Sequence, residues 1–422
     1  MEVFGGIDLF SPLIFINILE LLQTCSIIFF PIAVVTSITF ASILLYIGLF
    51  SFIILFFYRY KQNIEKLSIK HGKYLHIAFL LYILAYGVTK TVNSGLYQGL
   101  DKLFSCFTDY FIFIWLAVFI NDSNKQKLRI ALFFSGVLAV GYGLMQAIGL
   151  DLFHRQVNPL RLSGFHKNAY TYGGQLIIFF FLFLGVWYQT WKKLFRERKD
   201  ILRSIIYFCG LIATFFCILN TSERAVIFGV IIGLFVFFLI HLLIYKFKLE
   251  DISPFVVLFC FPLIVTSIFN KTVIKRIKRV FFPKNGKRGK KLNPRFRLWD
   301  IAIISWKKNL LFGSGEYPIV YNKVSEHMHV QVLTHAHSLY LQILVIHGLI
   351  GILAFINLMG AIFVKLFQSI KSNQFSLSLI AALVAFLVEG IFEYNWGDSE
   401  VRLLLLYVLG FVFANKAKNS LC

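Results

Sequence analysis

Long apolar runs, separated by short polar segments, fill most of this 422-residue chain. A helix needs about 20 apolar residues to cross a hydrocarbon core roughly 30 Å thick, so each run predicts a membrane span. Residues 8–58 are too long for one span, and we place a break at Pro31 because proline interrupts helical hydrogen bonding. The predicted spans lie near 13–32, 36–58, 76–93, 104–121, 128–149, 170–188, 204–220, 225–244, 254–270, 338–364, 375–394 and 400–415. The pattern predicts an all-α integral membrane protein with about 12 transmembrane helices.

The composition supports this class and excludes a soluble globular protein. Hydrophobic residues make up 58% of the chain, with a mean hydropathy of +0.76, whereas a typical soluble domain is about 45–50% apolar. The net charge of +22 would suggest a nucleic-acid partner in a soluble protein. In a membrane protein, we attribute most of it to cytoplasmic loops, and we expect no nucleic acid.

Lys and Arg are concentrated in alternate loops, and this bias predicts the orientation in a bacterial inner membrane. The basic set comprises 59–73, 122–129, 189–200, 245–251, 365–373 and the C-terminal tail. Placing that set in the cytoplasm divides the chain into spans 1–9 (residues 1–270), a long periplasmic loop (271–337), and spans 10–12 with a cytoplasmic tail (338–422). The first part of the loop is strongly basic, but loops longer than about 60 residues cross membranes largely regardless of charge.

A short helix is predicted inside the long loop. Asn293 is a good N-cap residue, and Pro294 suits the first helical turn. Large apolar residues then recur at helical spacing, at Trp299, Ile303, Trp306 and Leu310, before Gly313 and Gly315. We expect this helix to lie against the bundle or the membrane surface.

Several arginines stand out against the apolar background. Arg224 lies at the mouth of a span, where an arginine either marks the membrane boundary or binds a ligand. Arg295 and Arg297 in NPRFRLW either bind lipid headgroups or recognise phosphate, because the guanidinium presents paired donors and keeps its charge. Arg161 is a weaker candidate, as are the carboxylates of EGIFEYNWGDSE near the outer face, which include Glu393 and which either line a cavity or pair with a basic residue.

Histidines gather where the long loop meets the next span, in THAHSLYLQ. A neutral imidazole at His335 or His337 is suited to accept a proton from a sugar hydroxyl, or it caps a helix structurally. His-x-His also occurs twice, at 327/329 and 335/337, which is typical of zinc or copper ligands. No nearby cysteine or carboxylate cluster apart from Glu326 completes a site in the sequence, so we assign no metal.

Five segments, in order, resemble the O-antigen ligase and O-antigen polymerase family of bacterial surface-polysaccharide enzymes, from about residue 155 to 410. They are RLSGFHKNAY, TSERAVIFG, PRFRLWDIA followed by LLFGSGE, HAHSLYLQILVIHGLIGIL, and FEYNWGDSEV. The resemblance implies that Arg224 and Arg295 hold the donor pyrophosphate, with Arg297 in reserve, and that His337 is the catalytic histidine. Ser338 departs from the family pattern, because asparagine is common at that position.

The resemblance also implies a fold similar to the C-type glycosyltransferases and a reaction. The expected reaction transfers a glycan from undecaprenyl pyrophosphate to an acceptor sugar such as lipid A–core, with inversion and with no metal or other cofactor. A Wzy-type polymerase that extends the glycan is the alternative within the family. A lipid-linked sugar flippase would instead predict internal repeats and charges deep in several spans, and we find neither. A membrane scaffold with a basic lipid-binding loop is a third alternative.

Overall fold

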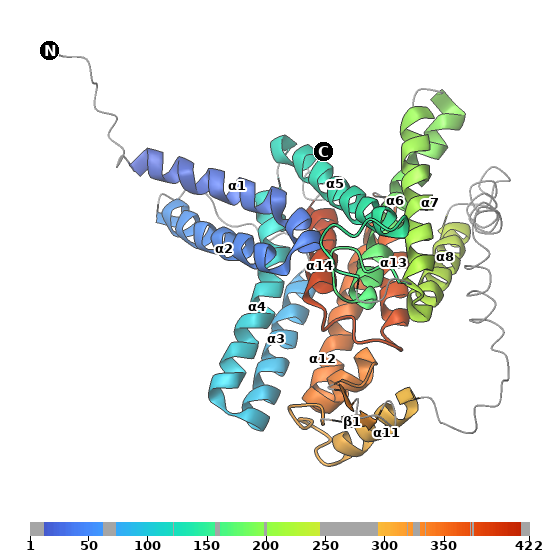
Figure 1. Cartoon of the computed structure of the whole chain (residues 1–422). Coiled ribbons are helices and arrows are strands. Elements are labelled where there is room, and N and C mark those ends of the chain that lie inside the picture. Colours follow the sequence, from blue (N-terminus) through green and yellow to red (C-terminus); the bar gives the residue numbers. More distant parts are fainter. Residues whose placement is uncertain are drawn as a thin grey trace, which may run out of the picture.

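The protein is described from a computed structural model (Figure 1). The described residues are 12–61, 73–120, 122–156, 161–197, 201–244, 294–318, 320–323, 330–333, 335–371, 373 and 375–414. The helices are α1 (Pro12–Thr36), α2 (Ile38–Lys61), α3 (Lys73–Ser94), α4 (Leu96–Phe119), α5 (Asp122–Ala147), α6 (Ala169–Glu197), α7 (Ile201–Thr221), α8 (Arg224–Ile244), α11 (Pro294–Lys307), α12 (Leu339–Ser369), α13 (Phe375–Glu389) and α14 (Ser399–Ala414). The strands are β1 (Val320–Lys323) and β2 (Val330–Leu333).

The described part of the chain is a multi-pass helical membrane protein. Eight of its helices are long and apolar enough to cross a membrane, and α13 is a shorter apolar helix. Every apolar run expected within the described residues coincides with a helix, and the run at 254–270 lies outside them. The two short strands, which pair antiparallel with Val320 opposite Leu333, were not expected from the sequence.

The break expected at Pro31 was wrong. Helix α1 continues through Pro31, and the chain leaves helical structure at Ser37 instead. Proline lacks the N–H that would bond the carbonyl of Ile27, four residues earlier. The hydroxyl of Tyr407 in α14 donates to that carbonyl at 3.0 Å. Because a neighbouring helix supplies the missing donor, the helix passes the proline without an unsatisfied group.

Helix α6 forms the centre of the bundle. Its most apolar window is 94% buried, and the residues from Leu176 to Leu184 are all buried. A helix that is apolar around its whole circumference has to be covered on every side, and α6 packs against α5, α7, α8, α13 and α14. The first turn of this central helix carries Tyr170 and Thr171, both beside residues of the candidate site.

A buried ion pair fastens α14 to α4. Arg402 donates from Nε to Asp109 Oδ1 at 3.1 Å and from Nη1 to the carbonyl of Trp396 at 2.6 Å. Charges are costly inside a membrane protein unless they are paired. The Trp396 indole in turn donates to the hydroxyl of Tyr82 in α3 at 3.0 Å. These bonds fix the loop between α13 and α14, which carries Glu393.

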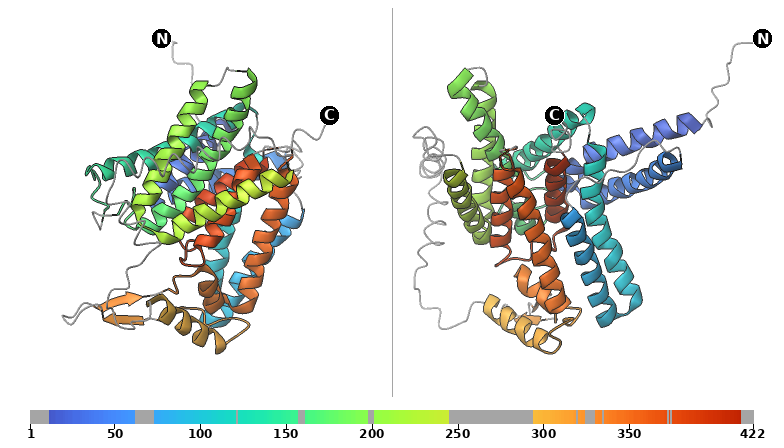
Figure 2. Two further views of the ribbon diagram at one scale, coloured as in Figure 1. Left: turned by 90° about the vertical axis from the view of Figure 1, so that its right-hand side faces the viewer. Right: turned by 180° about the vertical axis from the view of Figure 1, so that it is seen from behind.

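A lobe made of α11 and the two strands lies at one end of the bundle, beside the N-terminal end of α12 (Figure 2). Helix α11 begins at Pro294, as predicted. Its contact with the bundle falls on Leu298 and Ala302, which cluster with Val345 of α12, while Ile303 and Leu310 are exposed. The burial of one narrow face fixes the position of Arg295 at the start of α11.

The loop that follows α11 forms hydrogen bonds with α12 at a break in that helix. Gly348 adopts a φ of 61°, and the N–H groups of Leu349 and Ile350 bond to the carbonyls of Leu310 and Leu311. Ser314 donates its N–H to the carbonyl of Val345 at 2.6 Å. A Cβ at Gly348 would clash with the Leu311 carbonyl oxygen, so only glycine fits this approach. The backbone groups released by the break are therefore satisfied by the loop.

Candidate functional site

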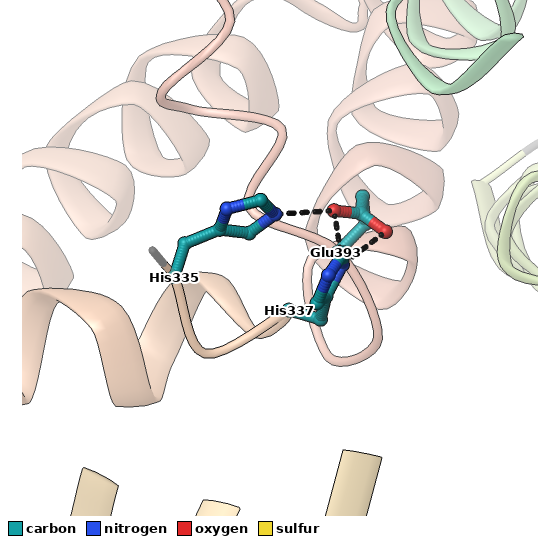
Figure 3. A group of neighbouring side chains, drawn as sticks. All are labelled: His335, His337 and Glu393. Atoms are coloured by element: carbon teal, nitrogen blue, oxygen red, sulfur yellow. Dashed lines mark hydrogen bonds and ion pairs between the residues drawn. The ribbon is translucent and has the colours of Figure 1, made fainter. Parts of the chain in front are cut away.

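The carboxylate of Glu393 is the centre of the candidate site (Figure 3). Glu393 lies in the loop between α13 and α14, and its side chain is 7% exposed. Nδ1 of His337 lies 3.0 and 3.1 Å from its two oxygens. Nε2 of His335 lies 3.7 Å from Oε1, and Nη2 of Arg295 lies 3.7 Å from Oε2. Three segments that are distant in sequence thus converge on one buried carboxylate.

The backbone around His337 holds this arrangement in place. His337 adopts a φ of 46°, a left-handed conformation that turns the chain just before α12. The N–H of Leu339, the first residue of α12, bonds to the carbonyls of Gly390 and Glu393 at 2.7 and 3.1 Å. The N–H of Ala336 is bound by Oε1 of Gln342 at 2.8 Å. The start of α12 is therefore anchored on the loop that carries its carboxylate partner.

Hydrogen bonding by the two imidazoles keeps Glu393 ionised. Burial by itself would raise the pKa of Glu393, but the imidazoles of His335 and His337 outweigh this effect and lower the pKa to about 2. Asp398 in the same loop behaves in the opposite way, because burial raises its pKa to about 6 although it accepts a hydrogen bond from Thr171 at 3.0 Å. The site therefore combines a permanent anion with a carboxyl group that titrates near neutrality.

A second ion pair lies at the junction of α7 and α8. Nη1 of Arg161 donates to Oε1 of Glu223 at 2.8 Å. Burial raises the pKa of Glu223 to about 7, Arg161 and Arg295 act to lower it, and the negative charge of Glu393 acts to raise it. Glu393 and Arg295 therefore both affect the pKa of Glu223, so the two ion pairs share one electrostatic environment.

The structure distributes the other predicted residues around these pairs. Arg224 follows Glu223 directly, is exposed at the first position of α8, and forms no ion pair with the described residues. Arg297 is exposed on α11. Ser338 occupies the N-cap position of α12, but its side chain makes no capping hydrogen bond. His327 and His329 lie outside the described residues.

The partners of the buried glutamates Glu223 and Glu393 were not predicted from the sequence. Glu393 was expected to line a cavity or to pair with a basic residue, but its partner His337 is 56 positions away in sequence. Glu223 precedes Arg224 in TSERAV, where only the arginine was named as a candidate. A glutamate beside an arginine at a span entry was the available signal, since buried carboxylates are rarely unpaired.

The arrangement permits two kinds of chemistry. With Nδ1 of His337 engaged by Glu393, Nε2 is the ring nitrogen left to accept a proton. Separately, His335, His337 and Glu393 offer ligand atoms that all lie within 4.8 Å of one another, and these three residues could hold a metal ion. Glu393 reaches the second His-x-His pair from the loop after α13, 56 positions beyond His337, so it was not among the groups near these histidines in sequence.

Comparison with known proteins finds a family that part of the chain resembles. No curated protein matches the chain. Residues 209–356 match the family model Wzy_C, described as O-antigen ligase. This match is narrower than the resemblance traced from residue 155 to 410; it includes Arg224, Arg295 and His337 but neither Arg161 nor Glu393. Residues 209–356 of this multi-pass helical membrane protein are therefore similar to the O-antigen ligase family.

Proposed function

We propose that the protein is an O-antigen ligase that transfers a glycan from undecaprenyl pyrophosphate to an acceptor sugar such as lipid A–core. The observation that carries this proposal is the bond between His337 and the buried carboxylate of Glu393, with Arg295 beside the same carboxylate. An oriented imidazole next to cationic groups is what a reaction between a sugar hydroxyl and a diphosphate leaving group requires.

Arg295 and Arg224 bind the donor pyrophosphate. Arg224 lies at the N-terminus of α8, where the helix dipole and the free N–H groups of the first turn also favour an anion. Arg295 is 31% exposed, so its guanidinium contacts Glu393 and still reaches a ligand. The lipid tail of the donor lies among the apolar helices, and the basic loop raises the local concentration of anionic donor and acceptor. The arginines stabilise the negative charge that develops on the departing pyrophosphate.

His337 is the general base. Its Nδ1–H donates to Glu393, so Nε2 is unprotonated and accepts the proton of the acceptor hydroxyl. The hydroxyl oxygen attacks the anomeric carbon from the face opposite the leaving group. The bond from that carbon to the pyrophosphate oxygen breaks with its electron pair on the oxygen, so undecaprenyl pyrophosphate departs and the configuration inverts. No step needs a metal or another cofactor.

The proposed orientation places this site in the periplasm. The site residues come from the loop before α6, the α7–α8 junction, the segment before α12 and the loop after α13. In a chain that crosses the membrane alternately, these helix ends share one side, and the Lys- and Arg-rich loops share the other. Labelling of a cysteine placed at exposed Glu316 with a membrane-impermeant reagent in intact spheroplasts tests this orientation. Labelling only after membrane permeabilisation would contradict it.

The glycan phenotype of a deletion strain separates the ligase from the Wzy-type polymerase. A ligase deletion removes all long chains from lipid A–core, and polymer accumulates on the carrier lipid. Core bearing a single repeat unit would instead assign the polymerase reaction.

A further inference from the structure

We propose that His335, His337 and Glu393 form a Zn²⁺ site whose occupation inhibits glycan transfer. The binding half of this proposal depends only on the three side chains. The inhibition half rests on the function proposed above. In this view zinc is a regulatory ligand, and the catalytic reaction remains independent of metal.

The spacing of the ligand atoms suits a tetrahedral ion. Zinc bonds of about 2.0–2.2 Å place neighbouring ligand atoms roughly 3.3 Å apart. Oε1 of Glu393 lies 3.0 Å from Nδ1 of His337 and 3.7 Å from Nε2 of His335. The two imidazole rings face the same carboxylate, with centroids 4.1 Å apart. Shifts of a few tenths of an ångström bring both of these ligand-atom spacings to tetrahedral values.

The donor set selects the class of metal. Two imidazole nitrogens and one carboxylate oxygen suit zinc, whereas Mg²⁺ and Ca²⁺ prefer all-oxygen sites. Three protein ligands leave the fourth position open to water. Arg295 lies 3.7 Å from the other oxygen of Glu393, where it orients the carboxylate as outer partners of metal ligands do. Its positive charge also weakens cation binding, so we expect zinc to be exchangeable.

The histidine tautomer explains why zinc inhibits. In the free site, the proton of neutral His337 lies on Nδ1, and Nε2 accepts the proton of the acceptor hydroxyl. Zinc binds the lone pair of Nδ1, so the single proton of the neutral ring moves to Nε2. The ring then donates from Nε2 and has no lone pair for the hydroxyl proton. One metal ion thus removes the base and also occupies the carboxylate that orients it.

Zinc binding to the purified full-length protein in lipid nanodiscs tests the site. After removal of metals with a chelator, Zn²⁺ alone is titrated against a fluorescent competitor. We expect one site in the wild-type protein and at least tenfold weaker binding in His335→Ala and Glu393→Gln. His154→Ala, at an exposed histidine of another loop, is the matched control and keeps full affinity. The double variant His327→Ala/His329→Ala also keeps the site if the assignment is correct.

The site assignment fails if His335→Ala and Glu393→Gln bind zinc as tightly as the wild-type protein. Inhibition is measured as each protein's transfer rate with zinc divided by its own rate with chelator. This ratio should fall at least tenfold in the wild-type protein and stay near one in His335→Ala. If zinc binds but does not slow transfer by the wild-type protein, the proposed inhibition is wrong and the assignment of the zinc site is unaffected. Absence of transfer from chelator-treated wild-type protein would instead count against the proposed function and leave the zinc site standing.

Discussion

The substitution Glu393→Gln tests the role of the buried carboxylate in the proposed reaction. Glutamine keeps the shape of the side chain and one acceptor oxygen, but it removes the negative charge that faces His337 at 3.0 Å. Its amide also presents N–H donors, which favour a tautomer with the proton on Nε2. The imidazole is then present but poorly prepared to accept a proton.

The size of the loss follows from the contact that is changed. A hydrogen bond to a charged group contributes about 1.5–3 kcal/mol, and this range corresponds to a roughly 10- to 150-fold decrease in kcat/KM. A larger decrease would indicate that the tautomer is inverted, because a wrong tautomer costs about 10⁴-fold in serine proteases. The loss should appear mainly in kcat, since the arginines that bind the donor are retained.

The assay is transfer from an undecaprenyl-pyrophosphate-linked glycan to lipid A–core by purified protein in nanodiscs, with chelator present. The matched control is Glu316→Gln, which removes a carboxylate that is 81% exposed and pairs with Lys90 at 3.7 Å. Exposed pairs contribute little, so the control should change the rate less than about twofold. A Glu393→Gln protein with wild-type kcat and a normal melting temperature would refute the role assigned to Glu393.

Three further predictions concern the donor site and the fold. Because burial raises the pKa of Glu223 to about 7, Glu223 gains its negative charge as the pH rises through that value, and donor KM should rise by about threefold to tenfold between pH 6 and 8. Glu223→Gln should flatten this dependence in a steady-state pH series, and an unchanged profile would exclude Glu223 as its source. Arg295→Gln should raise donor KM and lower kcat, whereas Arg297→Gln, on the exposed side of α11, should change both constants less than about twofold. Equal effects of the two substitutions would contradict the assignment of donor binding to Arg295. Arg402→Leu should lower stability by about 3–5 kcal/mol in a detergent melt, because it leaves Asp109 buried and unpaired. Adding Asp109→Leu should recover most of this loss. A single variant as stable as the wild type would show that the pair is dispensable.

The helices were predictable from the sequence because membrane spans depend on local information. An apolar run of sufficient length has to form its hydrogen bonds within itself, so the runs coincide with helices throughout the described chain. The start of α11 at Pro294 was also local, since the fixed φ of proline suits the first turn of a helix. Pro31 failed as a break because its effect depended on Tyr407, which is distant in sequence.

The candidate site was predictable only in part, for the same physical reason. Its residue types were visible, because arginine and histidine are rare against an apolar background. Their partners were not visible, because a buried carboxylate finds its cation through the packing of α12, α13 and α14 and not through sequence spacing. The pairs Arg161–Glu223 and Arg402–Asp109 have the same long-range origin.

The role of His337 as general base can be tested by comparing two substitutions of this residue. His337→Asn suits the left-handed backbone at φ 46° and keeps a hydrogen bond to Glu393 within reach, so the fold should survive. Single-turnover transfer is measured with donor bound to the wild-type protein, to this variant and to His337→Ala. Both variants should insert and bind donor normally but transfer about 10²- to 10⁴-fold more slowly. Transfer at the wild-type rate by either variant would contradict this role.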